Sequence, residues 1–181
     1  MNDLNTTIAQ LKHDFFAHRN GNVADALRRA GDQHHTIMGC QLHEVAAIAA
    51  QHTGDAVLAR ALWQQSQHRE CQLAATMLYP PQDLTLDEAL QWCSQVTTTE
   101  VADVLCHRLL RHAPCATSIV DSLLDSGDRL ARYTAVRLAL NLAIARRIDS
   151  RDTIVRWVAK AKEDADGTLL HIISSLEEEL D

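Results

Sequence analysis

Three polar side chains, Asp103, His107 and Arg111, recur every fourth residue in the segment TTEVADVLCHRLLR, which begins at Thr98. At the 3.6-residue period of an α-helix, this spacing places all three in one stripe along the helix. Such a stripe is a catalytic site, a binding site or a solvated face. Asp103 is the candidate for the centre of any site that it forms.

The opposite side of this segment is apolar, with side chains at Val101, Val104, Leu105 and Leu109. We therefore expect an amphipathic helix that packs on a core and presents Asp103 away from it. The alternative is that Asp103 is an exposed residue paired with His107, one helical turn further on.

The composition indicates the fold class in which such a helix would lie. Hydrophobic residues make up 46% of the 181, aromatic residues make up 4%, and the chain has only three prolines and six glycines. Alanine, leucine, arginine, glutamine and glutamate are strong helix formers and recur throughout. The sequence predicts an all-α protein in which residues 1–181 form a single helical-repeat domain.

Glycine, proline and capping signals divide the chain into about eleven expected helices. The pair Pro80-Pro81 is the firmest break, Thr85 and Glu88 form a capping box, and Ser150 caps a later helix. The expected helices cover residues 5–18, 23–30, 41–52, 56–64, 67–79, 86–96, 98–111, 114–124, 129–147, 151–162 and 168–180.

A faint internal period suggests how these helices are arranged. Bulky residues near helix ends (Trp63, Trp92, Leu124 and Trp157) follow one another at spacings of 29, 32 and 33. The segments LWQQSQHRECQLAATML and LLDSGDRLARYTAVRLA match in pattern at an offset of 61. Such periods predict HEAT-like helical hairpins stacked as an α-solenoid, with the tryptophans packed between repeats. A closed helical bundle is the alternative.

The sequence lacks the signals that mark secreted, membrane-spanning and metal-binding proteins. The N-terminus does not read as a signal peptide, and no apolar run is long enough to span a membrane. The five cysteines are widely spaced without a CxxC motif, and the ten histidines lack paired metal-ligand spacing. We expect reduced, buried thiols, no metal or cofactor, no membrane partner and a cytoplasmic location.

The charge of the chain is acidic overall but unusual in kind. The formal net charge is −7, which opposes nonspecific attraction to a polyanion. Of the 17 basic residues, three are lysines, which leaves fourteen arginines. Arginine suits fixed contacts to phosphates and carboxylates. A local basic strip on an acidic body is therefore compatible with the composition.

The order of these features resembles the DNA alkylation-repair glycosylase family, which is built from HEAT-like repeats. The matching stretches are MGCQLHEVAAIAAQH from Met38, LWQQSQHRECQLAATML from Leu62, TTTEVADVLCHRLL from Thr97 and DRLARYTAVRLALNLA from Asp128. The resemblance implies an alkylpurine DNA glycosylase or a DNA-binding relative of one.

The resemblance also assigns candidate residues. The catalytic helix of that family opens with a Trp-x-x-x-Asp arrangement, in which the carboxylate stabilises a cationic sugar and the aromatic ring attracts a cationic base. Here Asp103 matches the carboxylate, but Thr99 stands at the aromatic position. By the same resemblance, Arg132 would contact a phosphate next to Asp103.

Further arginines are candidate phosphate contacts. On the long helix, Arg129, Arg132, Tyr133 and Arg137 fall within about 140° of arc at 100° per residue. The alternative is that these arginines form ion pairs with nearby aspartates, Asp125 and Asp128, or with the previous repeat.

Arg69 begins the equivalent helix one double repeat earlier, and Glu70 beside it is expected to pair locally. Trp63, close to Arg69, is the one tryptophan considered for base stacking as well as for packing.

We therefore carry three hypotheses. The first is a DNA-binding protein with weak or lost base excision, the second is an active glycosylase that uses Asp103, and the third is a protein-interaction scaffold. The candidate nucleic-acid contacts are Arg69, Arg108, Arg111, Arg132, Arg137 and Trp63.

Overall fold

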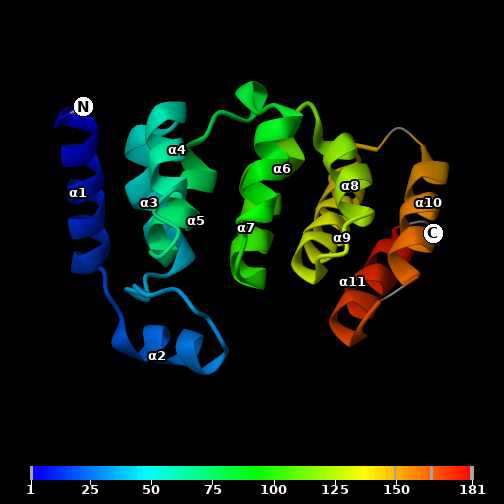
Figure 1. Ribbon diagram of the computed structural model, residues 1–181, viewed down its shortest axis with the longest axis horizontal. Coiled ribbons are helices and arrows are strands. Elements are labelled where there is room, and N and C mark those ends of the chain that lie inside the picture. The colour runs from blue at the N-terminus through cyan, green and yellow to red at the C-terminus, as the bar shows by residue number, and fades with distance from the viewer. Residues whose placement is uncertain (1, 149, 164, 180–181) are drawn as a thin grey trace. The chain divides into compact units, whose positions relative to one another are not determined.

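The computed structural model describes residues 2–148, 150–163 and 165–179 of the chain (Figure 1). The chain divides into two compact units, one ending at Pro80 and the other beginning at Pro81. Within the described residues, strand pairing is limited to one isolated bridge between Thr36 and His68. The prediction of an all-α fold is therefore confirmed.

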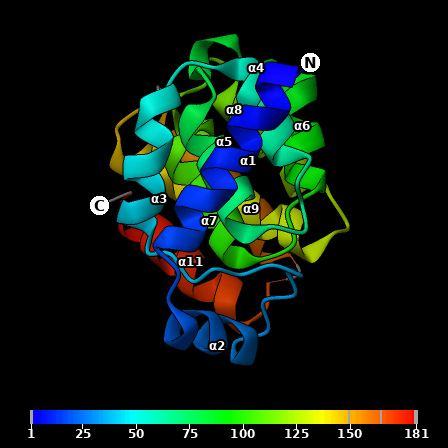
Figure 2. The same cartoon turned by 90° about the vertical axis from the view of Figure 1, so that its left-hand side faces the viewer.

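The first unit contains five α-helices and a short 3-10 turn among its described residues. These are α1 (Asn2–Ala17), α2 (Gly21–Arg29), α3 (Leu42–Ala49), η1 (Ala50–His52), α4 (Ala56–Trp63) and α5 (Arg69–Leu78). Helices α3 and α4 both pack on α5, which is buried along almost its whole length. Figure 2 shows α1 beside α3 and α4, with α2 lying apart from them at one end of this unit.

The second unit contains the remaining helices of the described chain. These are η2 (Pro81–Asp83), α6 (Leu86–Ser94), α7 (Thr99–Arg108), η3 (Leu110–His112), α8 (Ala116–Leu124), α9 (Arg129–Ile144), α10 (Arg151–Lys162) and α11 (Gly167–Glu178). Helix α9 packs against α7, α8, α10 and α11. Its buried alanines recur every fourth residue, at Ala131, Ala135, Ala139 and Ala143. Small side chains at that spacing let neighbouring helices approach α9 closely.

Most expected helix boundaries lie within a few residues of the observed ones, and the capping residues explain why. The hydroxyl of Thr85 accepts a hydrogen bond from the backbone N–H of Glu88, and that of Ser150 accepts from Asp152. Asn20 caps α2 in the same way, so that helix begins before its expected start. The last helix was expected to reach residue 180, which lies outside the described residues.

Three expected helices end differently in the structure. The segment expected to be helical over 98–111 forms α7 only to Arg108 and continues as η3 from Leu110, so Arg111 lies outside the helix that carries Asp103 and His107. The segment expected to be helical over 41–52 changes to a 3-10 turn after Ala49. The long helix ends at Ile144 because Arg146 adopts a left-handed backbone conformation with φ of 51°.

The three tryptophans lie in the cores of their own units, as the sequence predicts. Trp63 is 0% exposed, Trp92 is 3% exposed and Trp157 is 1% exposed. The indole N–H of Trp157 donates to Asp121 Oδ1 at 2.7 Å, which joins α10 to α8. Packing of these rings therefore contributes to the cores, in keeping with the large apolar area that each one buries.

The loop before α3 makes a close backbone contact at Gly39. This glycine has φ of +77°, and a Cβ atom added to it would lie 2.2 Å from Asn20 O and 2.8 Å from Ala24 N. The contact joins the loop to the start of α2, where Asn20 N also donates to Met38 O at 2.8 Å. Both the backbone conformation and the close approach require glycine at this position.

We expect Gly39→Ala to lower the free energy of unfolding of the first unit by more than ~3 kcal/mol, because it combines backbone strain with a clash against fixed backbone atoms. Gly31→Ala is the matched control, since Gly31 has φ of +94° but nothing lies within 4 Å of its added Cβ. That control should cost roughly 1–2 kcal/mol. Urea unfolding measures both, and equal losses would contradict the role of the close approach.

Candidate nucleic-acid interface

Asp103 lies on α7 and is held by two side chains of α9. The Tyr133 hydroxyl donates a hydrogen bond to Asp103 Oδ1 at 2.9 Å, and Arg137 Nε lies 2.7 Å from the same oxygen. The Asp103 side chain is 41% exposed and that of Arg137 is 29% exposed. We call Asp103, Tyr133 and Arg137 the Asp103 cluster. The cluster is a solvent-accessible ion pair supported by a buried tyrosine.

The members of the Asp103 cluster reinforce one another. Arg137 Nη2 donates to the Tyr133 hydroxyl at 3.3 Å, and its guanidinium carbon lies 5.8 Å from the centre of the Tyr133 ring. Burial raises the pKa of Tyr133, so its hydroxyl keeps the proton that it donates to Asp103. Burial opposes the charge of Arg137, but the hydrogen bond to Tyr133 and the charge of Asp103 raise its pKa overall.

The cluster forms because α7 and α9 pack side by side in parallel (Figure 1). Three contacts follow one another in the same order along both helices and the turns after them. Asp103 meets Tyr133, the Cys106 thiol donates to Thr134 O at 3.4 Å, and Arg147 Nη1 donates to Arg111 O at 2.5 Å. Parallel neighbouring second helices are the arrangement expected of stacked helical hairpins.

Arg137, and not Arg132, is the arginine beside Asp103. Arg132 Nη2 instead donates to Ala161 O on α10 at 3.1 Å. Five residues of helix separate the two arginines, which turns their side chains about 140° apart. The sequence-based expectation that Arg132 lies next to Asp103 is therefore corrected by the packing of α9.

A second group of basic side chains lies where α7 ends. It consists of His107, Arg108, Arg111, His112 and Arg147, and we call it the α7-end cluster. All are exposed except Arg111, which is half-buried. His107 lies one turn along α7 from Asp103, so the two clusters adjoin on the same helix.

The α7-end cluster is dense in positive charge. Arg111 Nε donates to His112 Nε2 at 3.0 Å. Burial, together with the charges of Arg111 and Arg108, lowers the pKa of His107. Burial lowers the pKa of His112, as do the charges of Arg111 and Arg147 and, to a smaller extent, that of His107. The arginines therefore lie close enough to these imidazoles to disfavour a further positive charge.

The sequence around both clusters contains few acids. No aspartate or glutamate occurs in residues 104–120 or in residues 129–148. Five arginines lie in the second of these stretches, namely Arg129, Arg132, Arg137, Arg146 and Arg147. Positive charge on these stretches of α7, η3 and α9 is thus offset only by carboxylates that lie outside them, as Arg137 is by Asp103 and Arg129 by Asp166.

Arg69 lies in the interior of the first unit. It is 2% exposed, and its Nη1 donates to Cys40 O at 3.1 Å and to Glu70 Oε1 at 2.8 Å. Glu70 is fully buried and accepts hydrogen bonds from the backbone N–H groups of Met38 and Gly39. The arginine and glutamate thus fix the loop before α3 to the start of α5, which confirms the local pairing expected of Glu70.

Trp63 is fully buried in the same unit, so its ring packs within the core of that unit. Among the candidate contacts, the structure gathers Arg108 and Arg111 in the α7-end cluster and Arg137 beside Asp103. It places Arg69 and Trp63 in the core of the first unit and directs Arg132 to α10.

Thr99 is exposed at the first position of α7, one helical turn before Asp103. The aromatic residue that contacts Asp103 is Tyr133, which does so through its hydroxyl and is only 8% exposed. Neither Thr99 nor Tyr133 therefore provides an accessible aromatic face beside the Asp103 carboxylate.

The sequence missed two contributors, Tyr133 as a partner of Asp103 and Arg147 as a member of the α7-end cluster. Tyr133 carried a signal, because it shares a helical stripe with Arg137. Arg147 carried none, because its position depends on the left-handed turn at Arg146.

The cysteines are unsuited to nucleophilic chemistry. Burial raises the pKa of Cys40, Cys71 and Cys93 to about 12 in each case. Burial also raises the pKa of Cys106 and of Cys115. A reactive cysteine needs the opposite shift, since the thiolate is the nucleophile.

The part of the chain that the structure describes contains neither a cluster of metal ligands nor a helix that could span a membrane. No group of three or more histidine, cysteine, aspartate or glutamate side chains there could hold a metal ion. None of the helices described combines the length and apolarity needed to cross a bilayer.

Comparisons with known proteins place these features in context. The sequence profile of the family described as DNA alkylation repair enzyme matches residues 11–169. The chain is similar to a solved structure described as "A new family of proteins related to the HEAT-like repeat DNA glycosylases with affinity for branched DNA structures". The similarity has a TM-score of 0.81 at 14% identity, over 94% of this chain and 74% of that chain. No curated protein sequence matches the chain. The structural comparison confirms the prediction of a HEAT-like repeat fold.

The Asp103 cluster leads to a stability prediction. Tyr133→Phe keeps the buried ring but removes the hydroxyl, and Asp103→Asn removes the charge that the hydroxyl contacts. We expect a coupling energy of about 0.5–1.5 kcal/mol between these changes, as for a hydrogen bond to a charged group that is partly solvated. A double-mutant cycle from urea unfolding measures it, and strictly additive losses would show that the contact contributes nothing.

Proposed function

This chain belongs to the DNA alkylation repair enzyme family, and we propose that it binds DNA through backbone phosphates, with weak or lost excision of alkylated bases. The proposed surface consists of the Asp103 cluster and the α7-end cluster in the second unit. Arg108, Arg111, Arg137 and Arg147 supply its positive charge.

The observation that carries this proposal is the gathering of arginines on helices with few carboxylates. Arg147 is held against η3 by its bond to Arg111 O, and Arg111 and Arg147 both depress the pKa of His112. Neutralisation of phosphates by such side chains releases counterions, which supplies most of the affinity in sequence-independent DNA binding. A local cluster can do this although the whole chain carries a net charge of −7.

The state of Asp103 supports weak or lost excision. A carboxylate stabilises a cationic sugar through its negative charge, and a positive group beside it reduces the field that the sugar experiences. Arg137 lies 2.7 Å from Asp103 Oδ1 and opposes that field, while Thr99 offers no aromatic face to attract a cationic base.

The choice of DNA form follows from the comparison. The similar solved structure is described as having affinity for branched DNA structures. We propose that branched DNA is a ligand of this chain as well, and it should be tested beside linear and nicked duplexes.

One observation favours the second candidate function, an active glycosylase with Asp103 as its catalytic residue. The Asp103 side chain is 41% exposed, so a sugar could approach it. In this case Arg137 would have to leave the carboxylate when DNA binds.

Binding is tested by fluorescence anisotropy with duplex, nicked and four-way DNA at low salt. We expect Arg137→Gln or Arg111→Gln to weaken binding about three- to tenfold, because each removes one phosphate-neutralising charge. Asp103→Asn should strengthen binding about two- to fivefold, because it frees Arg137 and removes a like charge from the phosphate path.

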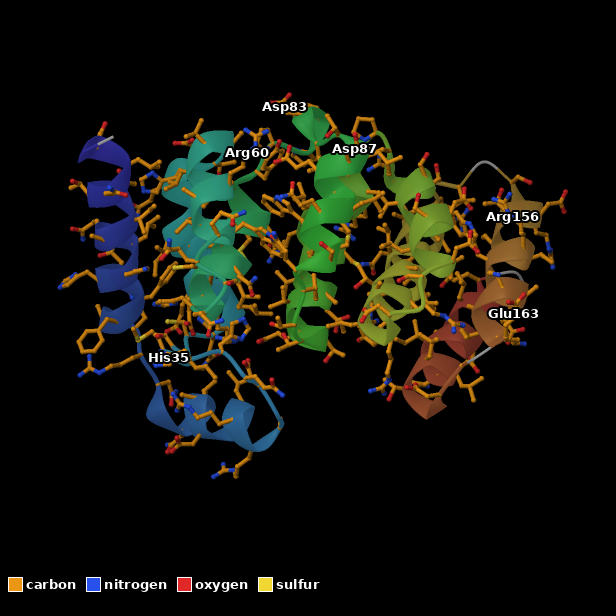
Figure 3. All side chains as sticks on the ribbon, in the orientation of Figure 1. His35, Arg60, Asp83, Asp87, Arg156 and Glu163 are labelled. Atoms are coloured by element: carbon orange, nitrogen blue, oxygen red, sulfur yellow. The ribbon has the colours of Figure 1, made fainter. Side chains whose placement is uncertain are left out.

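Arg156→Gln is the matched control, because Arg156 lies on α10 (Figure 3) and pairs with Asp121 at 3.0 Å with its side chain 64% exposed. The control should change affinity less than twofold, since it retains every member of both clusters. Binding no tighter than to an acidic control polymer would overturn the proposal and leave a protein-interaction scaffold as the function.

Excision is tested separately by release of free alkylated purine from methylated DNA. We expect release near background at micromolar protein, because the carboxylate is paired and the aromatic face is missing. Release that Asp103→Asn abolishes would establish the second candidate function instead.

A further inference from the structure

We propose that the α7-end cluster is a phosphate site that takes up protons on His107 and His112 when the phosphate binds. The ligand class is a phosphate group, and its source under the proposed function is the DNA backbone. The inference rests on that function for its source of phosphate, but the site itself is testable without DNA.

The geometry of the cluster presents several donors in a small region. Arg108 and His107 end α7, while Arg111 and His112 form the 3-10 turn that follows it. Arg147 reaches this turn from the residues after α9 and donates to Arg111 O at 2.5 Å. This bond holds Arg147 beside Arg111, although like charges repel one another.

The contact between Arg111 and His112 defines the protonation state of the imidazole. Arg111 Nε donates to His112 Nε2 at 3.0 Å, so this nitrogen carries a lone pair and the ring is neutral with its proton on Nδ1. Protonation of His112 Nε2 would break this bond. Both Arg111 Nε and His112 Nε2 would then be donors, and an anion that accepts from both would satisfy them.

The electrostatics of the cluster agree with this assignment. Burial and the arginines lower the pKa of both histidines, so both rings are neutral at neutral pH in the protein without bound phosphate. A phosphate placed among the arginines would offset their charges and raise the pKa of the histidines. At pH values between the lower histidine pKa of the free protein and the higher histidine pKa of the phosphate complex, binding of phosphate takes up protons. Affinity must therefore rise as the pH falls through this window and level off below it.

The carboxylates around the α7-end cluster determine how far a bound phosphate can shift the pKa of His107 and His112. On α7 itself, Glu100 and Asp103 are the acids, and Asp103 is paired with Arg137. The turn η2 packs against η3 and carries Asp83 (Figure 3). Helices α8 and α9 also pack against η3. The one charged residue of α8 is Asp121, which pairs with Arg156, and the charged residues of α9 are all arginines. The elements around the cluster thus supply few carboxylates to act as an internal anion.

The first experiment uses sulfate as a phosphate mimic of constant charge and follows the histidine ring signals of the full chain by NMR from pH 5 to 8.5. We expect sulfate to raise the titration midpoints of His107 and His112 by at least ~0.5 pH unit, since an anion within a few ångströms favours the charged ring. His171 on α11 is the internal control and should not move. Unchanged midpoints at saturating sulfate for His107 and His112 would overturn the proposal.

The second experiment measures DNA affinity at pH 8 and pH 6 for the full chain. We expect about tenfold tighter binding at pH 6 than at pH 8, and expect the double variant His107→Gln with His112→Gln to lose most of this ratio between the two affinities. His171→Gln should retain the whole gain. A gain that survives in the double variant would overturn the coupling to these histidines.

The two experiments separate the two proposals. Histidine shifts with sulfate and no DNA binding would contradict the proposed function but support the phosphate site. DNA binding that is insensitive to pH, together with histidines that sulfate does not shift, would support the proposed function and overturn the proton-coupled site.

Discussion

The parallel packing of α7 against α9 brings together the candidate functional side chains at Asp103 and aligns the turns that follow the two helices. One alignment brings Tyr133 and Arg137 to Asp103 and Arg147 to Arg111. The buried alanines of α9 permit the close approach, and the bond from the Cys106 thiol to Thr134 O falls between the two polar contacts. A rotation of α9 by a fraction of a turn would exchange Arg137 for other residues at Asp103. The geometry of the Asp103 cluster is therefore a property of helix packing, whereas Arg147 reaches Arg111 through the turn at Arg146.

Much of the fold could be predicted from the sequence because its signals are local. Side-chain caps at Thr85 and Ser150, the break at Pro80 and a composition rich in helix formers each act within a few residues. The burial of the tryptophans could also be predicted, because a repeat that returns the same bulky residue places it in equivalent packing positions. Local signals could not predict the left-handed residue at Arg146, which a glycine or asparagine would have marked.

The candidate site could be predicted only in part, because the rotation of one helix against another depends on tertiary packing. The sequence identified the helix that carries Asp103 and the arginine-rich helix beside it. It favoured Arg132, whereas packing presents Arg137 and turns Arg132 towards α10. Similarly, Arg69 has the residue type of a phosphate contact but serves as the partner of a buried carboxylate. Residue type could not distinguish these roles, since both require a guanidinium that meets an oxygen anion.

The burial of the Arg69–Glu70 pair has a consequence for how the protein responds to ionic strength. This pair lies in the interior of the first unit, with side chains 3% and 0% exposed, whereas the ion pair and basic cluster of the second unit face solvent. Dissolved ions screen exposed charges strongly and buried charges weakly. Under the proposed function, added salt would weaken the attraction of the second unit for DNA while leaving the buried pair that orders the first unit intact. Bound DNA could then be released without loosening the first unit.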